Sequence, residues 1–140
     1  MGKVQILAVL TMDGCLSSEL YDKAHQDLCL DRCGLDEIRE KALYHVTPDY
    51  SISMLHEWRK DGTNIRYLAE ATLDTEDYIN GLLRMHAVDE IILYTVPFIS
   101  GSGRHFFKSA LPEQHWTLSS LKSYSNGVCR IIYILDKKAR

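Results

Sequence analysis

The chain has 140 residues, of which 46% are hydrophobic and 25% are charged, and its formal net charge is −3. This length and composition predict one domain, residues 1–140, with a single core. The acidic excess and the scatter of the basic residues argue against a nucleic-acid partner. Because no apolar run approaches the roughly 20 residues that cross a bilayer and no cleavable leader pattern is present, we expect a cytoplasmic chain with no membrane partner.

The four cysteines are Cys15, Cys29, Cys33 and Cys129. They are widely spaced and accompany no secretory signal, so reduced thiols are expected. His25, Cys29 and Cys33 follow one another at four-residue steps and would share one face of a helix. A fourth ligand at a recognisable spacing is missing and buried cysteines are common, so the pattern favours packing and we expect no metal site.

The first predicted strand is Val4–Leu10, which is apolar almost throughout and β-branched in part. Such a strand belongs inside a sheet, beside another apolar strand. A turn follows it at residues 11–17, where glycine after aspartate accepts a positive φ in the pair Asp13-Gly14. The spacing alone is also that of an ordinary turn between a strand and a helix.

The middle of the chain alternates helical and extended patterns. A helix capped at Ser17 or Ser18 is expected to stop at Gly34. The predicted elements that follow are a helix at Leu35–Lys41, a strand at Ala42–Thr47, a helix at Ser51–Lys60, a strand at Asn64–Ala69 and a helix at Thr75–His86. The last helix has an apolar stripe of Tyr78, Ile79, Leu82, Leu83 and Met85.

Ile91–Val96 follows the acidic pair Asp89-Glu90, runs apolar without a charge and ends at Pro97. It lacks the alternation of a half-exposed strand, so helices should cover both of its faces. Ligands of open α/β sheets bind beyond the carboxyl ends of the strands. The loop Pro97–Arg104 is therefore a candidate site.

The last part of the chain predicts a helical turn at Lys108–Leu111 and then two strands, Trp116–Tyr124 and Val128–Leu135. Asn126-Gly127 between the strands is a strong hairpin signal, and we interpret the hairpin as a structural edge of the sheet. Residues 136–140 form a charged tail that should be exposed. The fold class is thus α/β, with a mainly parallel central sheet between helical layers and an antiparallel C-terminal hairpin.

Val88–Phe107, with its Val-Asp-Glu opening, apolar strand, proline and Gly-Ser-Gly turn, resembles the dihydrofolate reductase superfamily. The similarity is greatest to the branch that contains the reductase domain of riboflavin biosynthesis. Leu7–Ser17 and Tyr124–Tyr133 lie where that family has corresponding segments. The resemblance implies a dihydrofolate reductase-like fold and hydride transfer from NADPH to a pterin- or pyrimidine-like small molecule, as in 5-amino-6-(5-phosphoribosylamino)uracil reductases.

The same resemblance assigns site residues. Asp13 is the implied catalytic residue, since it is the acid nearest the strand-end site. The implied substrate-binding residues are Thr11, Gly14, Pro97, Arg104 and His105. The implied cofactor-binding residues are Ala8, Gly101, Ser102 and Gly103. For Arg104 and His105, a solvated loop is the alternative interpretation.

The chain departs from the family pattern at two phosphate-binding turns. It has no Gly-Arg-x-Thr unit, and no glycine lies between Gly62 and Gly81. Asp74, Glu76 and Asp77 instead surround a helix start, where carboxylates repel a diphosphate. The alternative function is a non-catalytic relative that binds a ligand or forms oligomers. Loss of a strand and helix should also leave an edge uncovered, so we expect a homodimer.

Overall fold

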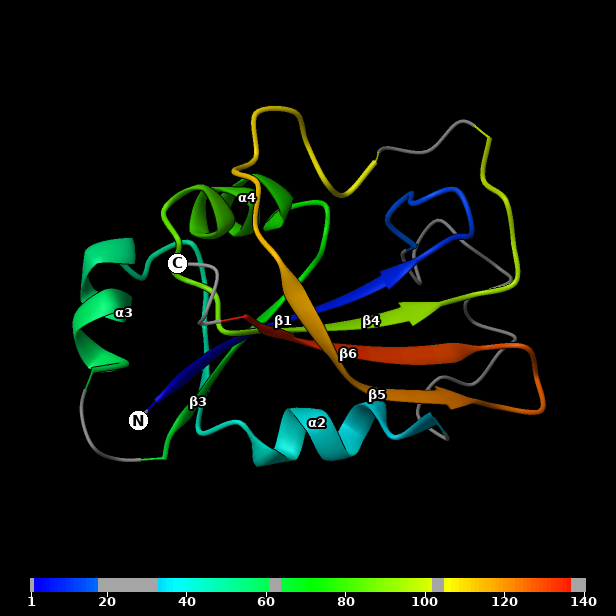
Figure 1. Ribbon diagram of the computed structural model, residues 1–140, viewed down its shortest axis with the longest axis horizontal. Helices are drawn as coiled ribbons and strands as arrows, with labels where there is room; N and C mark the ends of the chain where they lie inside the picture. Colours follow the sequence, from blue (N-terminus) through cyan, green and yellow to red (C-terminus); the bar gives the residue numbers. More distant parts are fainter. Residues whose placement is uncertain (1, 18–32, 61–63, 102–104, 137–140) are drawn as a thin grey trace.

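β1 and β4 lie side by side at the centre of a six-stranded sheet with the order β2-β3-β1-β4-β6-β5 (Figure 1). The computed structural model describes residues 2–17, 33–60, 64–101 and 105–136. The strands are β1 (Lys3–Leu10), β2 (Tyr44–His45), β3 (Arg66–Glu70), β4 (Glu90–Thr95), β5 (Trp116–Ser123) and β6 (Cys129–Leu135). The helices in these ranges are α2 (Leu35–Lys41), α3 (Ile52–Trp58) and α4 (Glu76–Arg84).

Four strands are parallel and two are antiparallel. β2, β3, β1 and β4 pair in parallel, whereas β6 pairs antiparallel with both β4 and β5. The predicted α/β class, with a mainly parallel sheet and a C-terminal hairpin, is therefore confirmed. The expectation that β1 lies beside β4 is also confirmed, with Ile6 opposite Ile91 and Leu10 opposite Thr95.

Helices pack on both faces of the central strands, as the uncharged run in β4 predicts. On one face α3 and α4 bury Leu55, Ile79 and Leu82 against β1. On the other face α2 buries Leu35 against a cluster that includes Ile92. Each fully buried aliphatic side chain contributes about 1.5–3 kcal/mol by leaving water, so these two layers hold the parallel strands in place.

The acidic pair before β4 has a structural role at the amino ends of the strands. Asp89 is 8% exposed, and its carboxylate accepts a hydrogen bond from the Val4 backbone N–H at 2.9 Å. The Arg59 guanidinium, after α3, lies 3.7 Å from the same carboxylate and donates to the His86 carbonyl at 2.9 Å. Asp89 thus joins β1, β4 and α3 at the end of the sheet away from the loop after β4.

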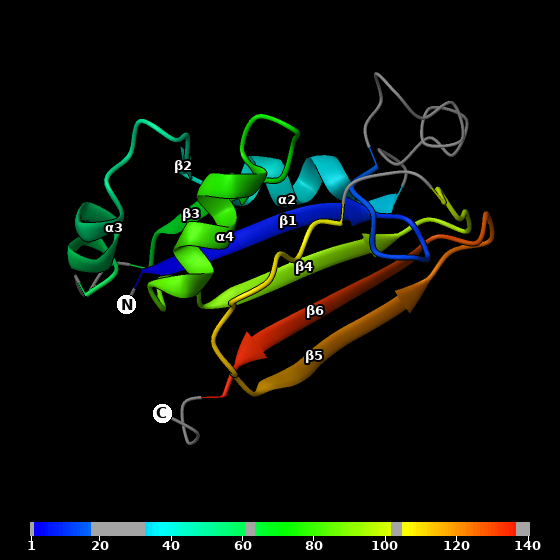
Figure 2. The ribbon, with the colours of Figure 1, turned by 90° about the horizontal axis from the view of Figure 1, so that it is seen from above.

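The β5–β6 hairpin extends beyond the helices on one side of the sheet (Figure 2). Gly127 in its turn has a φ of +91°, which glycine adopts without steric cost. A bulge between Leu118 and Ser120 changes the strand's alternation. Leu118 and Leu121 are 52% and 62% exposed, so the outer strand presents apolar side chains to solvent.

Several predicted elements differ from the structure. β2 has only two residues, where the sequence predicts a strand over Ala42–Thr47. The predicted helical turn at Lys108–Leu111 is absent, and Ala110 in it has a φ of +63°. Met85 follows the end of α4 and is 57% exposed, so it lies outside the buried stripe. The predicted helix that ends at Gly34 lies mostly outside the described residues.

Three cysteines lie in the described ranges. Cys15 and Cys33 are buried, Cys129 is partly buried, and these three form no disulfide. His25 and Cys29, from the four-residue pattern, lie outside the described residues. No helix in the described parts of the chain is long and apolar enough to cross a membrane.

Candidate functional site

The loops that follow β1 and β4 join at the carboxyl ends of these strands. The Met12 N–H donates to the Phe98 carbonyl at 2.7 Å, and the Phe106 N–H donates to the Gly14 carbonyl at 3.1 Å. Cys15 also forms an isolated antiparallel bridge with His105. The turn at residues 11–17 and the loop around residues 97–107 are therefore one unit, as expected for adjacent parallel strands.

The Asp13 carboxylate connects the two loops through hydrogen bonds. One oxygen accepts hydrogen bonds from the Thr11 hydroxyl and from the Ser100 N–H, the latter at 3.2 Å, and the other accepts from the Gly101 N–H at 3.0 Å. The Thr11 and Gly101 hydrogen bonds, in that order, lower the pKa of Asp13 from its usual 3.8. Asp13 therefore lies beside Gly101, and its carboxylate is ionised at neutral pH and holds the loop in place.

Thr11 and Gly14 also stabilise the turn at residues 11–17. Thr11 is 3% exposed, and its hydroxyl donates to Asp13 while accepting the Cys15 N–H at 3.0 Å. Gly14 has a φ of +80°, and a Cβ there would lie 3.8 Å from the His105 ring. The hydroxyl of Thr11 is therefore engaged within the loop, and glycine is required at position 14 by its backbone conformation.

The other residues implied by the resemblance fall in different surroundings. Ala8 is 1% exposed in the core beneath α4, so its methyl group packs and faces no ligand site. Pro97 and His105 are exposed at the strand-end unit. Three further residues lie outside the described ranges: Ser102, Gly103 and Arg104.

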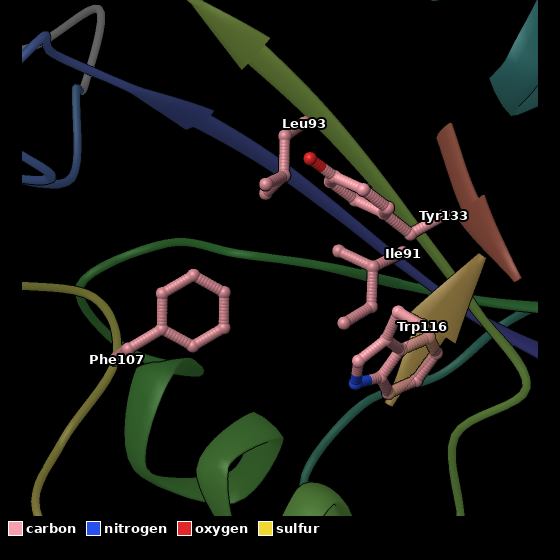
Figure 3. A pocket seen from close by; sticks show the side chains of 5 residues that line it. All are labelled: Ile91, Leu93, Phe107, Trp116 and Tyr133. Carbon is pink, nitrogen blue, oxygen red and sulfur yellow. The ribbon is translucent and has the colours of Figure 1, made fainter. Parts of the chain in front are cut away.

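An apolar cavity of about 370 Å³ opens between the β5–β6 hairpin and the loop that contains Phe107. We call it the aromatic cavity, and it is lined by Ile91, Leu93, Phe107, Trp116 and Tyr133 (Figure 3). Three of the five lining side chains are aromatic, and their rings lie around the opening (Figure 3). A flat ring is the kind of ligand that such a lining accommodates.

A second cavity of about 340 Å³ lies at the strand end. We call it the proline cavity, and it is lined by Met12, Thr95, Val96, Pro97, Gly127, Cys129 and Ile131. A Cβ at Gly127 would lie only 3.0 Å from Pro97 Cγ, so the hairpin turn approaches the proline closely. Glycine at 127 is thus needed both for its positive φ and for this contact.

The two cavities are neighbours on the same face of the sheet. Leu93 lines the aromatic cavity and Ile131 lines the proline cavity, and these two residues are opposite each other in the β4–β6 ladder. Opposite residues on one face of an antiparallel pair lie about 4.5–5.5 Å apart. The molecule therefore has space for two rings next to each other.

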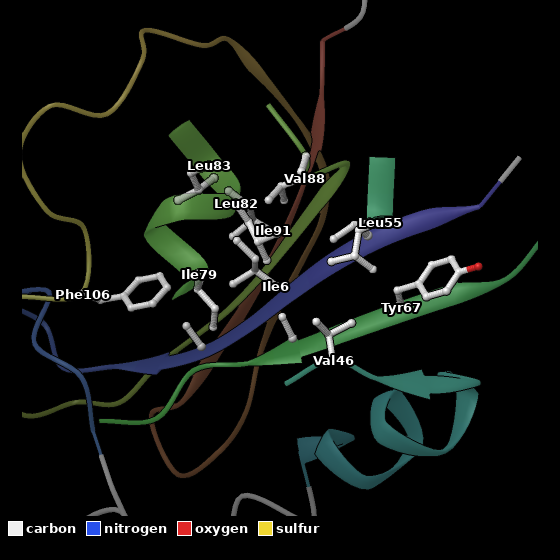
Figure 4. Close-up of a cluster of buried hydrophobic side chains, with 14 of the residues drawn as sticks. Ile6, Val46, Leu55, Tyr67, Ile79, Leu82, Leu83, Val88, Ile91 and Phe106 are labelled. Carbon is white, nitrogen blue, oxygen red and sulfur yellow. The ribbon is translucent and has the colours of Figure 1, made fainter. Parts of the chain in front are cut away.

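Side chains of α4 hold the loop that contains Phe106 and Phe107. The Asn80 amide donates to the Phe106 carbonyl at 2.8 Å and accepts the Lys108 N–H at 3.1 Å. Glu76 is 1% exposed, with its carboxylate 3.5 Å from the Lys108 ammonium. Phe106 itself lies beside α4 in the core (Figure 4).

The acidic turn before α4 differs from the sequence interpretation in one respect. The carboxylate of Glu76 is directed inward to Lys108, so it does not face a ligand at the helix start. Asp74 and Asp77 are exposed. The Thr75 hydroxyl donates to the Glu70 carbonyl at 2.8 Å and is part of the turn. Two surface carboxylates therefore remain where a diphosphate would approach.

Sequence reasoning missed most of the residues that line the cavities. Trp116 and Tyr133 belong to a hairpin that the sequence indicates to be structural, and Phe107 follows the candidate loop. The available signal was the pairing of an Asn-Gly turn with aromatic residues on the strands it joins. That signal shows which residues face each other, but not that the adjacent face is uncovered.

Comparisons with known proteins assign the fold. No protein-family model matches the chain. No curated protein matches it either. Among solved structures, it is similar to a candidate riboflavin biosynthesis protein from Shewanella sp. PV-4, with a TM-score of 0.63 and 11% identity over 96% of this chain and 99% of that one.

Two further solved structures share the fold. Acinetobacter baumannii RibD (form 1) has a TM-score of 0.59 and 13% identity, and the alignment covers 98% of this chain but 59% of RibD. The riboflavin biosynthesis reductase Rib7 of Saccharomyces cerevisiae has a TM-score of 0.55 and 10% identity, with 97% of this chain and 89% of that one covered. The chain therefore has the dihydrofolate reductase-like fold of riboflavin biosynthesis reductases, as the sequence motifs indicate.

Proposed function

We propose that the chain is a cytoplasmic reductase that transfers a hydride from a nicotinamide cofactor, NADPH by resemblance, to a pterin- or pyrimidine-like ring. The observation that carries this proposal is the pair of adjacent apolar cavities, of about 370 and 340 Å³, on one face of the sheet. Hydride transfer needs two rings in contact and shielded from water. Two neighbouring ring-sized cavities would place the two rings side by side, and the bound rings would cover each other.

The residues of the chain orient the rings and exclude water. Phe107, Trp116 and Tyr133 provide aromatic walls for one ring, and Pro97 with Met12 borders the other. A bound nicotinamide supplies the hydride. Because hydrogen bonds keep Asp13 ionised, we propose that it positions the loop and that solvent supplies the proton.

The start of α4 does not fit a cofactor diphosphate. Asp74 and Asp77 are exposed there, and the turn has no glycine that would let the backbone approach phosphate oxygens. Each like-charge contact at about 4 Å costs on the order of 1 kcal/mol even in water. The proposal therefore predicts that NADPH binds weakly. Most of its binding free energy should come from the nicotinamide ring.

The second candidate is a ring-binding protein without turnover. It is favoured by the engagement of the Thr11 and Asp13 side chains inside the loop, which leaves these polar groups turned away from the cavities. Under this candidate the cavities bind a flat ligand, and the nicotinamide cofactor is not used.

A paired assay separates the two candidates. NADPH and NADH are each incubated with the protein and a 5-amino-uracil ribotide, and oxidation of the nicotinamide is followed by absorbance. The reductase proposal predicts oxidation that stops when the substrate is omitted and slows in Phe107→Ala. Saturable binding of the uracil compound without any oxidation supports the ring-binding candidate and contradicts the reductase.

We further propose that the chain forms a homodimer through the edge at β2. Leu43, Tyr44 and Met54, around β2 and α3, are 63%, 42% and 43% exposed, and a two-residue edge strand leaves them uncovered by the sheet. Exposed apolar groups at a sheet edge favour association.

Light scattering tests the dimer and should give twice the chain mass of 16.1 kDa. Leu43→Asp should halve the measured mass, whereas the control Leu121→Asp on β5 should leave it unchanged. A monomeric mass for the unmodified protein over a wide concentration range contradicts the dimer.

A further inference from the structure

A polar cavity of about 230 Å³ lies beneath α2. We call it the α2 trough. Ile92 and Ile132 contribute to its lining, whereas their chain neighbours Leu93 and Ile131 line the two apolar cavities. Successive residues of a strand point to opposite faces of the sheet. The trough is therefore on the other face and is separate from the proposed reductase site.

Six polar residues dominate the lining of the trough: Gln5, Glu37, Lys41, Arg66, Glu90 and Arg130. Three are cationic and two are anionic, so their formal charge is +1. Among the described residues, the side chains of Lys41 and Arg66 have no hydrogen-bond or ion-pair partner. The nearest cation to Glu90 is Lys3, at 4.0 Å. The trough thus contains charged groups that the fold itself does not use.

Two of its polar groups have no hydrogen-bond partner in the described parts of the chain. Gln5 is 4% exposed, and its amide forms no hydrogen bond within the described parts of the chain. The Nε of Arg130 is buried and also lacks a hydrogen-bond partner there. Buried polar groups in native proteins are paired with protein, water or ligand, because leaving them unpaired is costly. The buried Nε of Arg130 therefore indicates an occupant of the trough.

The cationic groups lie toward opposite ends of α2. Arg66 is beside the end of the helix, since its carbonyl accepts the Leu43 N–H at 3.1 Å. Arg130 is beside the start, since its Nη1 lies 3.3 Å from where a Cβ on Gly34 would be. The seven residues of α2, from 35 to 41, span about 10 Å along the helix. A ligand in the trough would thus meet positive charge at each end.

We propose that the α2 trough binds a small hydroxylated dicarboxylate. The planar guanidinium of Arg66 or Arg130 matches a carboxylate with two parallel hydrogen bonds. Glu37, Glu90 and the Gln5 carbonyl accept hydrogen bonds from hydroxyl groups between the ends. Two singly charged carboxylates suit a lining of charge +1 better than two phosphates, which carry about 1.5–2 charges each at neutral pH.

Isothermal titration calorimetry of the full chain with four probes tests this proposal. L-malate should bind more tightly than succinate, which lacks the hydroxyl, and more tightly than acetate, which has one carboxylate. Fructose 1,6-bisphosphate should bind more weakly than malate. Equal heats from acetate and malate, tighter binding of the bisphosphate, or no malate binding at millimolar concentration would overturn the proposal.

Variants assign the binding to the trough. Arg66→Gln and Lys41→Gln should each weaken malate binding about tenfold, the change expected from one lost charge-assisted hydrogen bond. Lys41 is exposed on α2, so its replacement leaves the core intact. Lys60→Gln is the matched control, because Lys60 is exposed and pairs with Glu57 away from the trough. Equal losses in all three variants would show non-specific attraction and contradict the site. Phe107→Ala should leave malate binding unchanged, so this result is independent of the proposed reductase activity.

Discussion

The turns that follow β1 and β3 lie at the same edge of the parallel sheet but differ in what they leave at the surface. After β1, Asp13 turns its carboxylate onto the backbone of Ser100 and Gly101, and an apolar cavity lies beside the turn. After β3, Thr75 is turned inward to Glu70, while Asp74 and Asp77 stay exposed.

The difference indicates which turn admits a ligand. Both turns use their central polar side chains for internal hydrogen bonds, so neither offers them to a substrate. The turn after β1 adds an uncharged surface that suits a ring, whereas the turn after β3 adds two carboxylates that repel phosphate. Binding at this edge should therefore depend on apolar contact near β1 and β4 and be opposed near α4.

Phe106 links the turn after β1 to α4, and its loss should have the largest effect. It is fully buried, its N–H donates to Gly14 and its carbonyl accepts the Asn80 amide. Phe106→Ala should lower the free energy of unfolding by about 3–5 kcal/mol, measured by urea denaturation. Phe107→Ala is the control, because Phe107 is 42% exposed and should cost less than about 1 kcal/mol. Equal losses in the two variants would show that Phe106 does not anchor the loop.

Asn80 should show the next largest effect. Its amide is buried on α4 and bonds to the Phe106 carbonyl and the Lys108 N–H. Asn80→Ala leaves these groups without their partner and should cost about 1–3 kcal/mol of unfolding free energy. Gln114→Ala, whose amide contacts His86 at the surface, should change stability little. An unchanged denaturation midpoint in Asn80→Ala would mean that the loop is held by other contacts.

The two exposed carboxylates before α4 should have a smaller effect, on binding. Asp74→Asn and Asp77→Asn should each tighten NADPH binding about fivefold, the equivalent of about 1 kcal/mol. Glu76 is left unchanged because it pairs with Lys108. Asp49→Asn, another exposed carboxylate, is the control. Affinities that do not change, measured by thermal shift, would place the phosphates away from this turn.

The smallest effect at neutral pH is expected for Asp13→Asn, and its signature is the dependence of stability on pH. Because hydrogen bonds lower the pKa of Asp13 in the folded state, its ionised form stabilises the fold above about pH 4. This contribution is lost as the pH falls below the usual value of 3.8 toward the lower folded value. Urea denaturation from pH 7 to pH 3 should show the wild type losing its advantage over Asp13→Asn in the acid range. A constant difference across the range would contradict the brace.

The sequence was most informative at positions where burial or turn geometry allows few residue types. The uncharged run Ile91–Val96 predicts the central strand, and Asn126-Gly127 predicts the hairpin, because burial and turn geometry restrict the choices. The neighbourhood of Asp13 and Gly101 also follows from parallel strands ending together. What it did not predict is the direction of a side chain. Asp13 in a turn is compatible with either a catalytic or a bracing role until its hydrogen bonds are known.

The cavities were harder to predict because they depend on which part of a face of the sheet is left uncovered by other segments of the chain. Trp116 and Tyr133 have the pattern of an ordinary edge hairpin, and no local signal shows that the face beside them stays open. The same holds for Glu76, whose inward direction follows from Lys108, 32 residues later in the chain.

Fluorescence of Trp116 tests the central claim, that a ring binds in the aromatic cavity, most directly. The chain has two tryptophans, and Trp58→Phe leaves Trp116 as the only one. Titration of this variant with NADPH should quench the emission saturably, with a dissociation constant above about 10 μM because the phosphates are poorly accommodated. Adding Phe107→Ala should weaken this binding further. Emission that does not change up to millimolar NADPH, or quenching that Phe107→Ala does not affect, would contradict the account.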